Sequence, residues 1–190
     1  WLTAIAGPMV LWLGLAGIAI GVLYSLPRIY LAGRGLGELS VFIAFGPLPV
    51  CGAAWLQDGI FDVGRLLISI PVGMWTAAIL LINEVPDLRS DAAAGKRTLV
   101  VRTGVGGARV LYLGMHVAGT VGAIAAMAIG ALPWWFAVPV AALLALAVKA
   151  GLGIASVDEQ REQLQKSIEL TLAIQALGSV ALIATIALAR

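Results

Sequence analysis

The sequence predicts an all-α, polytopic transmembrane helical bundle, and its composition, the length of its apolar segments and the placement of its charges support that class. Of the 190 residues, 61% are hydrophobic and only 12% are charged, and the mean hydropathy is +1.02. Soluble domains contain about 25% charged residues, so this chain carries too few charges to cover a water-facing surface. We therefore expect an integral membrane protein built from helices.

Six apolar segments approach the length of about 20 helical residues that crosses the hydrocarbon core of a bilayer. They are Leu2–Tyr24, Leu39–Leu56, Leu66–Asn83, Ala108–Ala131, Trp134–Val148 and Ile168–Ala189. The fifth is short and contains Pro139, so it is the segment least expected to form a regular helix. Thr171, Gln175 and Ser179 form a polar stripe in the last segment, and such stripes usually face the interior of a bundle.

Basic residues lie almost entirely on one side of the predicted membrane. With six spans, the connections near 25–38, 84–107 and 149–167 share one side. Ten of the twelve lysines and arginines lie in or beside these connections, whereas only Arg65 and Arg190 lie on the other side. By the positive-inside rule we expect the first side to be cytoplasmic, in a cell inner or plasma membrane.

Net charge and cysteine content argue against two other classes of protein. The net charge is only +2 and no basic run is present, so nothing favours a nucleic-acid partner. A single cysteine, Cys51, cannot form an intrachain disulfide, which gives no support for an oxidised secreted scaffold.

A polar motif follows the third predicted span. Asn83, Asp87 and Asp91 recur at every fourth position, a spacing that places side chains on one stripe of a helix. Pro86 disfavours a continuous helix through this motif. We expect the third span to end near Asn83 and a short helix to follow, with Pro86 in its first turn, Asp87 and Asp91 on one face, and Gly95 at its end.

These residue types suit a site for a metal ion and a diphosphate. Mg²⁺ in proteins commonly takes one or two carboxylates together with waters and phosphate oxygens, and Asp87 and Asp91 lie one turn apart. Lys96 and Arg97 follow and could bind the same phosphate group by charge-assisted hydrogen bonds. The alternative is an ordinary loop whose acids and bases solvate one another, and the spacing alone does not separate the two interpretations.

The connection between the first two predicted spans is rich in glycine. Gly33, Gly35 and Gly37 alternate around Arg34, so the backbone could approach a ligand closely. One interpretation is a loop that presents Arg28 and Arg34 to an anion. The other is that the two arginines anchor a loop on the cytoplasmic side.

Several strings together resemble the UbiA superfamily of membrane prenyltransferases. They are Asn83-Glu-x-Pro-Asp87-x-x-x-Asp91-x-x-x-Gly-Lys-Arg-Thr-Leu-Val-Val-Arg102, which is similar to the second aspartate-rich motif of the family, and Tyr24-Ser-x-Pro, Arg34-Gly-Leu-Gly-Glu38 and Phe45-Gly-Pro-Leu-Pro49, which resemble the preceding loop and helix. The resemblance covers essentially the whole chain. It looks most like the branch that prenylates 1,4-dihydroxy-2-naphthoate.

The resemblance implies a fold and an activity. Residues 1–190 would form the C-terminal part of one UbiA-type domain, and their six spans would be the last six of a nine-helix bundle. The implied reaction is the Mg²⁺-dependent transfer of a polyprenyl group from polyprenyl diphosphate to an aromatic acceptor, which we expect to be the 1,4-dihydroxy-2-naphthoate of menaquinone biosynthesis. The lipid bilayer would surround the enzyme. The active-site loops would face the cytoplasm.

The resemblance also implies roles for particular residues. The catalytic metal ligands would be Asp87 and Asp91, with support from Asn83. The loop that closes over the substrate head group would contribute Tyr24, Arg28 and Arg34. For Lys96 and Arg97, which lie within the matching string, contact with the diphosphate is inferred from their charge.

The sequence departs from the family pattern in two respects. The first aspartate-rich motif and the three helices expected to carry it are not in the sequence, so we expect the 190 residues alone to be inactive. The glycine-rich loop reads Pro27-Arg28 where many relatives have paired prolines, and Gly33 precedes Arg34 where an aromatic residue is often found.

Alternative functions come from the same superfamily and from other classes. Another branch would prenylate 4-hydroxybenzoate, homogentisate, haem or a glyceryl phosphate. A transporter or channel fragment is a further alternative, because polar residues inside membranes also mark transport pathways; the charges here cluster in loops on one face instead. An inactive, degraded copy of the enzyme is the last alternative.

Overall fold

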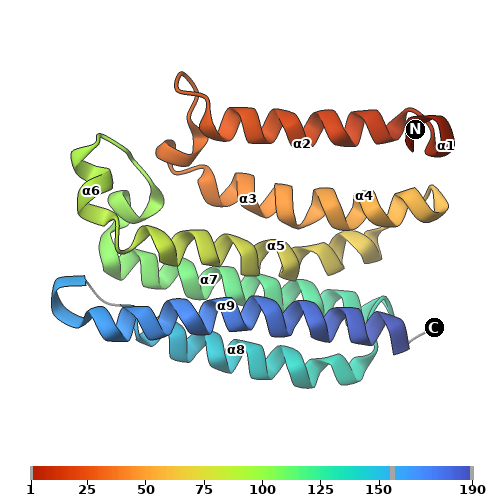
Figure 1. Cartoon of the computed structure of the whole chain (residues 1–190). Coiled ribbons are helices and arrows are strands. Elements are labelled where there is room, and N and C mark those ends of the chain that lie inside the picture. Colours follow the sequence, from red (N-terminus) through yellow and green to blue (C-terminus); the bar gives the residue numbers. More distant parts are fainter. Residues whose placement is uncertain (1, 155–156, 189–190) are drawn as a thin grey trace.

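The chain folds into a row of roughly antiparallel helices (Figure 1). The structure is a computed structural model that describes residues 2–154 and 157–188. Its elements are α1 (Leu2–Ala6), α2 (Met9–Ser25), η1 (Leu31–Arg34), α3 (Gly37–Phe45), α4 (Pro47–Asp58), α5 (Val63–Glu84), α6 (Leu88–Ala93), α7 (Leu99–Ala128), η2 (Trp134–Phe136), α8 (Ala137–Leu152) and α9 (Val157–Leu188). No β-strand occurs in these described ranges, and the predicted all-α class is confirmed. Ala189 and Arg190, which the sequence analysis assigned to the last span and its flank, lie outside the described residues.

Most of the predicted spans are present as long apolar helices. Within the described ranges, five helical segments are long and apolar enough to cross a membrane: Gly37–Asp58, Val63–Glu84, Leu99–Ala128, Trp134–Leu152 and Arg161–Leu188. The first predicted span is corrected, because Gly7 (φ +85°) and the following Pro8 divide it into α1 and α2. Helix α2 is apolar but has only 17 residues.

Two prolines had effects that the sequence analysis did not anticipate. The second predicted span bends between α3 and α4, where Gly46 leaves the helical region and Pro47 begins the next helix. Helix α8, by contrast, is regular although it contains Pro139. Pro139 lies in the first turn of α8, where its missing N–H would have no intrahelical partner.

The fourth predicted span begins earlier than expected and is kinked. Thr98 caps α7 by accepting a hydrogen bond at its Oγ1 from the N–H of Val101 (3.3 Å), so the helix starts nine residues before the predicted Ala108. Within the helix, Gly104 has φ +66°, a conformation that favours glycine. The first turn of α7 is thereby set at an angle to the rest.

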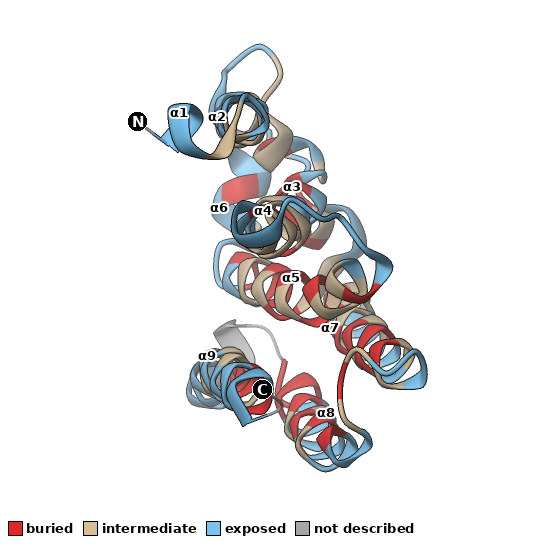
Figure 2. Cartoon of the chain, turned by 90° about the vertical axis from the view of Figure 1, so that its right-hand side faces the viewer, coloured by how far each residue is buried: buried red, intermediate tan, exposed pale blue. Residues whose placement is uncertain are grey.

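The buried core lies among α5, α7, α8 and α9, whereas α2 lies at the edge of the row with every residue at least partly exposed (Figure 2). Helix α5 packs against α3, α4, α7 and α9. Small residues allow these approaches: a Cβ atom at Gly122 of α7 would lie 2.8 Å from the Cβ of Ile70. Thr171 of the predicted polar stripe is buried and shares a 2.8 Å hydrogen bond with Tyr112, so its predicted inward orientation is confirmed.

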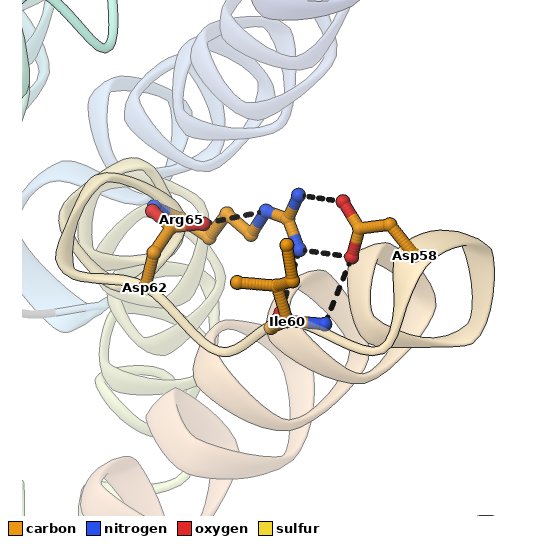
Figure 3. A network of polar contacts seen from close by, with 4 residues as sticks. All are labelled: Asp58, Ile60, Asp62 and Arg65. Carbon is orange, nitrogen blue, oxygen red and sulfur yellow. Dashed lines mark hydrogen bonds and ion pairs between the residues drawn. The ribbon is translucent and has the colours of Figure 1, made fainter.

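Alternating helix directions give the bundle two ends. The connections α2–α3 and α5–α7 lie together at one end, which we call the basic end, and the α4–α5 connection lies at the opposite end (Figure 1). The α4–α5 connection is closed by Arg65, whose guanidinium binds both Asp58 and Asp62 and the carbonyl oxygen of Ile60 (Figure 3). Asp62 also caps α5 by accepting the N–H of Arg65 (2.9 Å). We call residues 58–65 the Arg65 loop.

Candidate functional site at the basic end

Two segments far apart in the sequence are joined at the basic end by hydrogen bonds to main-chain carbonyl groups. The N–H of Arg97 donates to the carbonyl oxygen of Gly33 (2.7 Å). The guanidinium of Arg102 donates from Nη2 to the carbonyl oxygen of Arg34 (2.6 Å) and from Nε to that of Arg97 (2.9 Å). The α2–α3 connection is therefore fixed against the first turn of α7.

The fold of the α2–α3 connection depends on unusual backbone conformations. Tyr30 has φ +45° and Gly35 has φ +74°, both in the left-handed region that non-glycine residues rarely adopt. The Tyr30 ring lies directly over Gly33, so a side chain at position 33 would collide with it. Arg34 then reaches back and donates from Nη2 to the carbonyl oxygen of Arg28 (2.9 Å).

The second segment is shaped by the end of α6. Gly95 has φ +75°, and the N–H of Lys96 donates to the carbonyl oxygen of Asp91 (3.0 Å), as is common where glycine ends a helix. The reversal brings the Lys96 ammonium back to the Asp91 carboxylate, with 2.6 Å between Nζ and Oδ1. This hydrogen bond raises the pKa of Lys96 above its ordinary value.

Between the two segments lies a cavity of about 410 Å³, which we call the basic cradle. Its lining residues are Pro27, Tyr30, Gly33, Arg34, Ala94, Gly95, Lys96, Arg97 and Arg102. Four of them are cationic, and none of the described lining residues is acidic. The cradle therefore has the composition of an anion-binding site.

The positive charges of the cradle arginines are not paired with carboxylates among the described residues. Arg34 and Arg102 donate to carbonyl oxygens, and neither they nor Arg97 form an ion pair with a carboxylate among the described residues. A guanidinium has five N–H donors in a planar fork that matches phosphate oxygens. This arrangement can bind a phosphate or diphosphate by several charge-assisted hydrogen bonds.

The structure brings together three of the five residues that the sequence analysis assigned to diphosphate binding. Arg34, Lys96 and Arg97 line the cradle. The side chain of Arg28 is exposed and does not line it, and its carbonyl oxygen holds Arg34 instead. Tyr24 lies outside the cradle at the end of α2.

The three residues assigned to metal binding occupy different environments. Asn83 and Asp87 are exposed, whereas Asp91 is buried and is bound by Lys96. Asp91 follows Asp87 by one helical turn, with 2.8 Å between its N–H nitrogen and the carbonyl oxygen of Asp87. In the described part of the chain, no three His, Cys, Asp or Glu side chains are grouped as ligands of one ion. The carboxylates nevertheless offer the hard oxygen donors that suit Mg²⁺.

Four residues of the site were not assigned a role from the sequence. Tyr30 and Arg102 line the cradle, and Glu38 and Glu84 are buried beside it with 4% and 8% of their surface exposed. Arg102, Glu38 and Glu84 lie within the strings that resemble the UbiA superfamily, so their place in those motifs could have indicated a role. Tyr30 lay outside those strings, and nothing in the sequence indicated its left-handed conformation.

Comparison with known proteins gives a consistent family match. The model of the UbiA prenyltransferase family matches residues 1–187. Similar proteins include the 1,4-dihydroxy-2-naphthoate octaprenyltransferases of Mycobacterium tuberculosis (33% identity, covering 76% of this chain and 49% of the relative) and Bacillus subtilis (32% identity, 66% and 41%). The 2-carboxy-1,4-naphthoquinone phytyltransferase of Synechocystis is 40% identical over 53% of this chain and 34% of its own length. The chain thus spans about half or less of the relatives it matches, and no solved structure matches it.

Proposed function

Because the chain belongs to the UbiA prenyltransferase family, we propose that it transfers a polyprenyl group from a polyprenyl diphosphate to an aromatic acceptor, with the help of Mg²⁺. We propose 1,4-dihydroxy-2-naphthoate as the acceptor, since two relatives named for that substrate match 76% and 66% of the chain. The basic end would face the cytoplasm, where the positive-inside rule puts loops rich in Lys and Arg.

The observation that carries this proposal is the basic cradle. A diphosphate brings several negative charges to the membrane surface, and the cradle offers Arg34, Lys96, Arg97 and Arg102 with no acid among its described lining residues. Hydrogen bonds to main-chain carbonyl oxygens join two segments that are far apart in the sequence, and the cations of both segments line one cavity. Such preorganised donors stabilise charge without reorganising when the charge develops.

The reaction requires a leaving group and a nucleophile. The C–O bond between the allylic carbon and the diphosphate breaks, and its electron pair leaves on the diphosphate oxygen. The acceptor ring forms a new bond to the allylic carbon, and the attacked ring carbon then loses the group it carried, a proton or a carboxyl group as CO₂. Arg34, Arg97 and Arg102 act on the first part, because they bind the oxygens on which negative charge grows.

The metal would be held by the acidic motif that follows α5. Asp87 and Asp91 are the proposed carboxylate ligands, with Asn83 in support. A bound Mg²⁺ supplies positive charge that neutralises the departing diphosphate. Lys96 holds the Asp91 carboxylate through the 2.6 Å contact, which positions that carboxylate next to the cradle.

The isoprenoid tail would lie in an apolar cavity near the cradle. A cavity of about 370 Å³ between α2 and α3 is lined by Gly17, Ile20, Gly21, Tyr24, Ser40, Val41, Ala44 and Phe45. Tyr24 connects the two regions, because it lies at the basic end of α2 within electrostatic range of Lys96. An apolar environment excludes water from the cation-like prenyl group and so favours transfer over hydrolysis.

An acceptor panel tests the proposal. The full-length protein in lipid nanodiscs is supplied with Mg²⁺, one radiolabelled polyprenyl diphosphate and, in separate reactions, 1,4-dihydroxy-2-naphthoate, 4-hydroxybenzoate, homogentisate and a glyceryl phosphate. We expect lipid-soluble labelled product with the naphthoate. Product with another acceptor and none with the naphthoate would move the chain to another branch, and no product with any acceptor would reject prenyl transfer to these compounds.

A further inference from the structure

A cavity lies between α8 and α9 at the basic end, on the opposite side of the row of helices from α2 (Figure 1 and Figure 2). Its volume is about 440 Å³, and we call it the α8–α9 groove. It shares no lining residue with the basic cradle, whose walls come from the α2–α3 connection, the α6–α7 connection and α7. The groove is therefore a separate feature, and the proposed prenyl transfer gives it no role.

Two stripes of residues at helical spacing form most of the walls of the groove. On α8 the stripe is Ala145, Val148, Lys149 and Leu152, and on α9 it is Gln163, Lys166, Ser167 and Leu170. Each stripe follows the i, i+3, i+4, i+7 pattern that places side chains on one face of a helix. The two helices touch beside it, because a Cβ atom at Gly153 would collide with Oγ of Ser167. The groove is thus built into the contact between two long helices.

The polarity of the groove changes along its length. Helix α8 runs toward the basic end and α9 runs away from it (Figure 1). Ala145 and Leu170 therefore each lie four residues, about 6 Å, farther from the basic end than the lysine of the same helix. Both helices are apolar and long enough to cross a membrane. The groove is consequently apolar toward the middle of the bilayer and cationic toward its surface, which matches an amphipathic anion.

The two lysines are the only charged residues of the described groove lining. Lys149 lies in the last turn of α8 and forms no ion pair with the described residues. Lys166 lies 2.6 Å from Glu162, measured from Nζ to Oε1, but the two side chains are 71% and 84% exposed. Ion pairs with this exposure are weak, so the Lys166 ammonium can exchange Glu162 for a phosphate. Both positive charges are therefore available to an anion.

We propose that the α8–α9 groove binds one anionic phospholipid from the leaflet at the basic end. Its phosphate lies between Lys149 and Lys166, and one acyl chain extends past Ala145 and Leu170. Basic pockets between membrane-spanning helices are a known kind of site for anionic lipid headgroups. A lysine ammonium is a compact point charge on a flexible stem, which suits a single phosphate at the membrane surface, whereas the arginines of the cradle offer planar forks. The bound lipid would hold α8 to α9.

Lipid binding to the full-length protein in detergent micelles tests the proposal. The protein is titrated with dioleoyl phosphatidylglycerol or with phosphatidylcholine of the same chains, and bound lipids are counted by native mass spectrometry. We expect tight binding of one phosphatidylglycerol, with Kd raised about fivefold by Lys149→Gln or Lys166→Gln, as for the loss of one basic contact at a membrane surface. Arg161→Gln is the matched control, because it removes a positive charge of α9 that does not line the groove, and it should leave Kd unchanged.

Three outcomes of this titration overturn the proposal. The first is an unchanged Kd in both lysine variants, and the second is equal binding of phosphatidylcholine. The third is displacement of the lipid by an excess of inorganic phosphate, which would make the groove a site for free anions. Inorganic phosphate has no chain to fill the apolar part of the groove, so we expect it to leave the lipid bound.

Photocrosslinking of the unmutated protein covers variants that fold poorly. The full-length protein in nanodiscs receives a small share of phosphatidylglycerol with a diazirine in its acyl chain, and the crosslinked peptides are identified after illumination. We expect crosslinks concentrated on residues 145–152 and 163–170, and suppressed by unlabelled phosphatidylglycerol but not by phosphatidylcholine. Crosslinks spread evenly over the membrane-spanning helices would overturn the proposal. Suppression by a polyprenyl diphosphate would also overturn it, because the groove would then hold the prenyl donor.

Discussion

Charged side chains have different partners at the two ends of the bundle. In the Arg65 loop, one guanidinium satisfies both acids: Nη1 lies 2.7 Å from Asp58 Oδ1 and Nε lies 2.7 Å from Asp62 Oδ2 (Figure 3). At the basic end, Arg34 and Arg102 donate to carbonyl oxygens, and three of the four carboxyl oxygens of the buried Glu38 and Glu84 have no donor among the described residues. The Arg65 loop is complete by itself, whereas the basic end has both positive and negative groups that are left to interact with something else.

This difference separates structural charges from candidate functional ones. Asp58, Asp62 and Arg65 lie within eight residues of one another, and their contacts account for the closed connection between α4 and α5. The cations of the basic cradle instead come from η1, the α6–α7 connection and α7, and Arg34 and Arg102 donate to main-chain carbonyl oxygens rather than to carboxylates. Variants placed in matched pairs at the two ends can test whether that separation is correct.

The largest expected effect comes from the acidic motif. Asp87→Asn and Asp91→Asn should each lower kcat by about 10²–10³-fold, because each removes a carboxylate that would bind the metal beside the leaving group. Asp58→Asn is the matched change in the Arg65 loop and should leave kcat within about twofold. Single-turnover prenyl transfer with the full-length protein measures all three. Full activity of both motif variants would show that Asp87 and Asp91 do not bind a catalytic metal and belong to an ordinary solvated loop.

The next largest effect should come from Arg102. Arg102→Gln removes donors to the carbonyl oxygens of Arg34 and Arg97, and it also removes one positive charge from the cradle. We expect KM for the polyprenyl diphosphate to rise about tenfold, as for the loss of a strong charge-assisted contact. Arg65→Gln, the matched change at the other end, should lower thermal stability and leave this KM unchanged. Equal KM effects from the two variants would contradict the distinction between the ends.

A smaller effect should follow from a methyl group on one glycine. Gly33→Ala places a Cβ in the space occupied by the Tyr30 ring, so the ring must move and the wall of the cradle changes shape. We expect KM for the diphosphate to rise several-fold. Gly59→Ala in the Arg65 loop meets no neighbouring atom but forces alanine to φ +75°, which costs roughly 1–2 kcal/mol of stability. KM should change in Gly33→Ala, and the melting temperature should change in Gly59→Ala. Both quantities are measured on both variants.

The smallest expected effect is that of salt. Raising NaCl to about 0.5 M shortens the screening length to a few ångströms, so KM for the diphosphate should increase a few-fold. The difference in melting temperature between Arg65→Gln and the unchanged protein should shrink over the same range, because the Arg65 contacts are exposed to solvent. A KM that is independent of salt would argue against recognition by the cradle charges.

The sequence predicted the helices and the end on which the charges gather, because both follow from the order of apolar and charged residues along the chain. It also predicted a short helix that ends before Gly95, which the structure has as α6, but α6 begins at Leu88 after the N-cap Asp87, so Pro86 precedes the helix instead of lying in its first turn. It did not predict the bend at Gly46, where a Cβ would lie 2.8 Å from the Cα of Gly73. That requirement is set by a neighbouring helix and cannot be read from the residues around Gly46.

The candidate site could be predicted only in part, for a similar reason. Arg34, Lys96 and Arg97 were recognised from motif and charge, but Arg102 donates to a residue 68 positions away. Glu38 and Glu84 looked like ordinary members of polar motifs until the structure placed both in a buried setting. Nothing in the residues around Gly33 indicates that the Tyr30 ring fills the space above it.

The hydrogen bonds that build the cradle have a consequence for how its sequence can vary. Their acceptors are the carbonyl oxygens of Arg28, Gly33, Arg34 and Arg97. Every amino acid carries such an oxygen, so position 28 can exchange arginine for proline without losing the acceptor that holds Arg34. Substitutions at such positions would drift independently of the arginine donors, and correlated changes between them would be weak even though the groups touch. In an alignment, the donors would therefore stand out as fixed residues surrounded by variable partners.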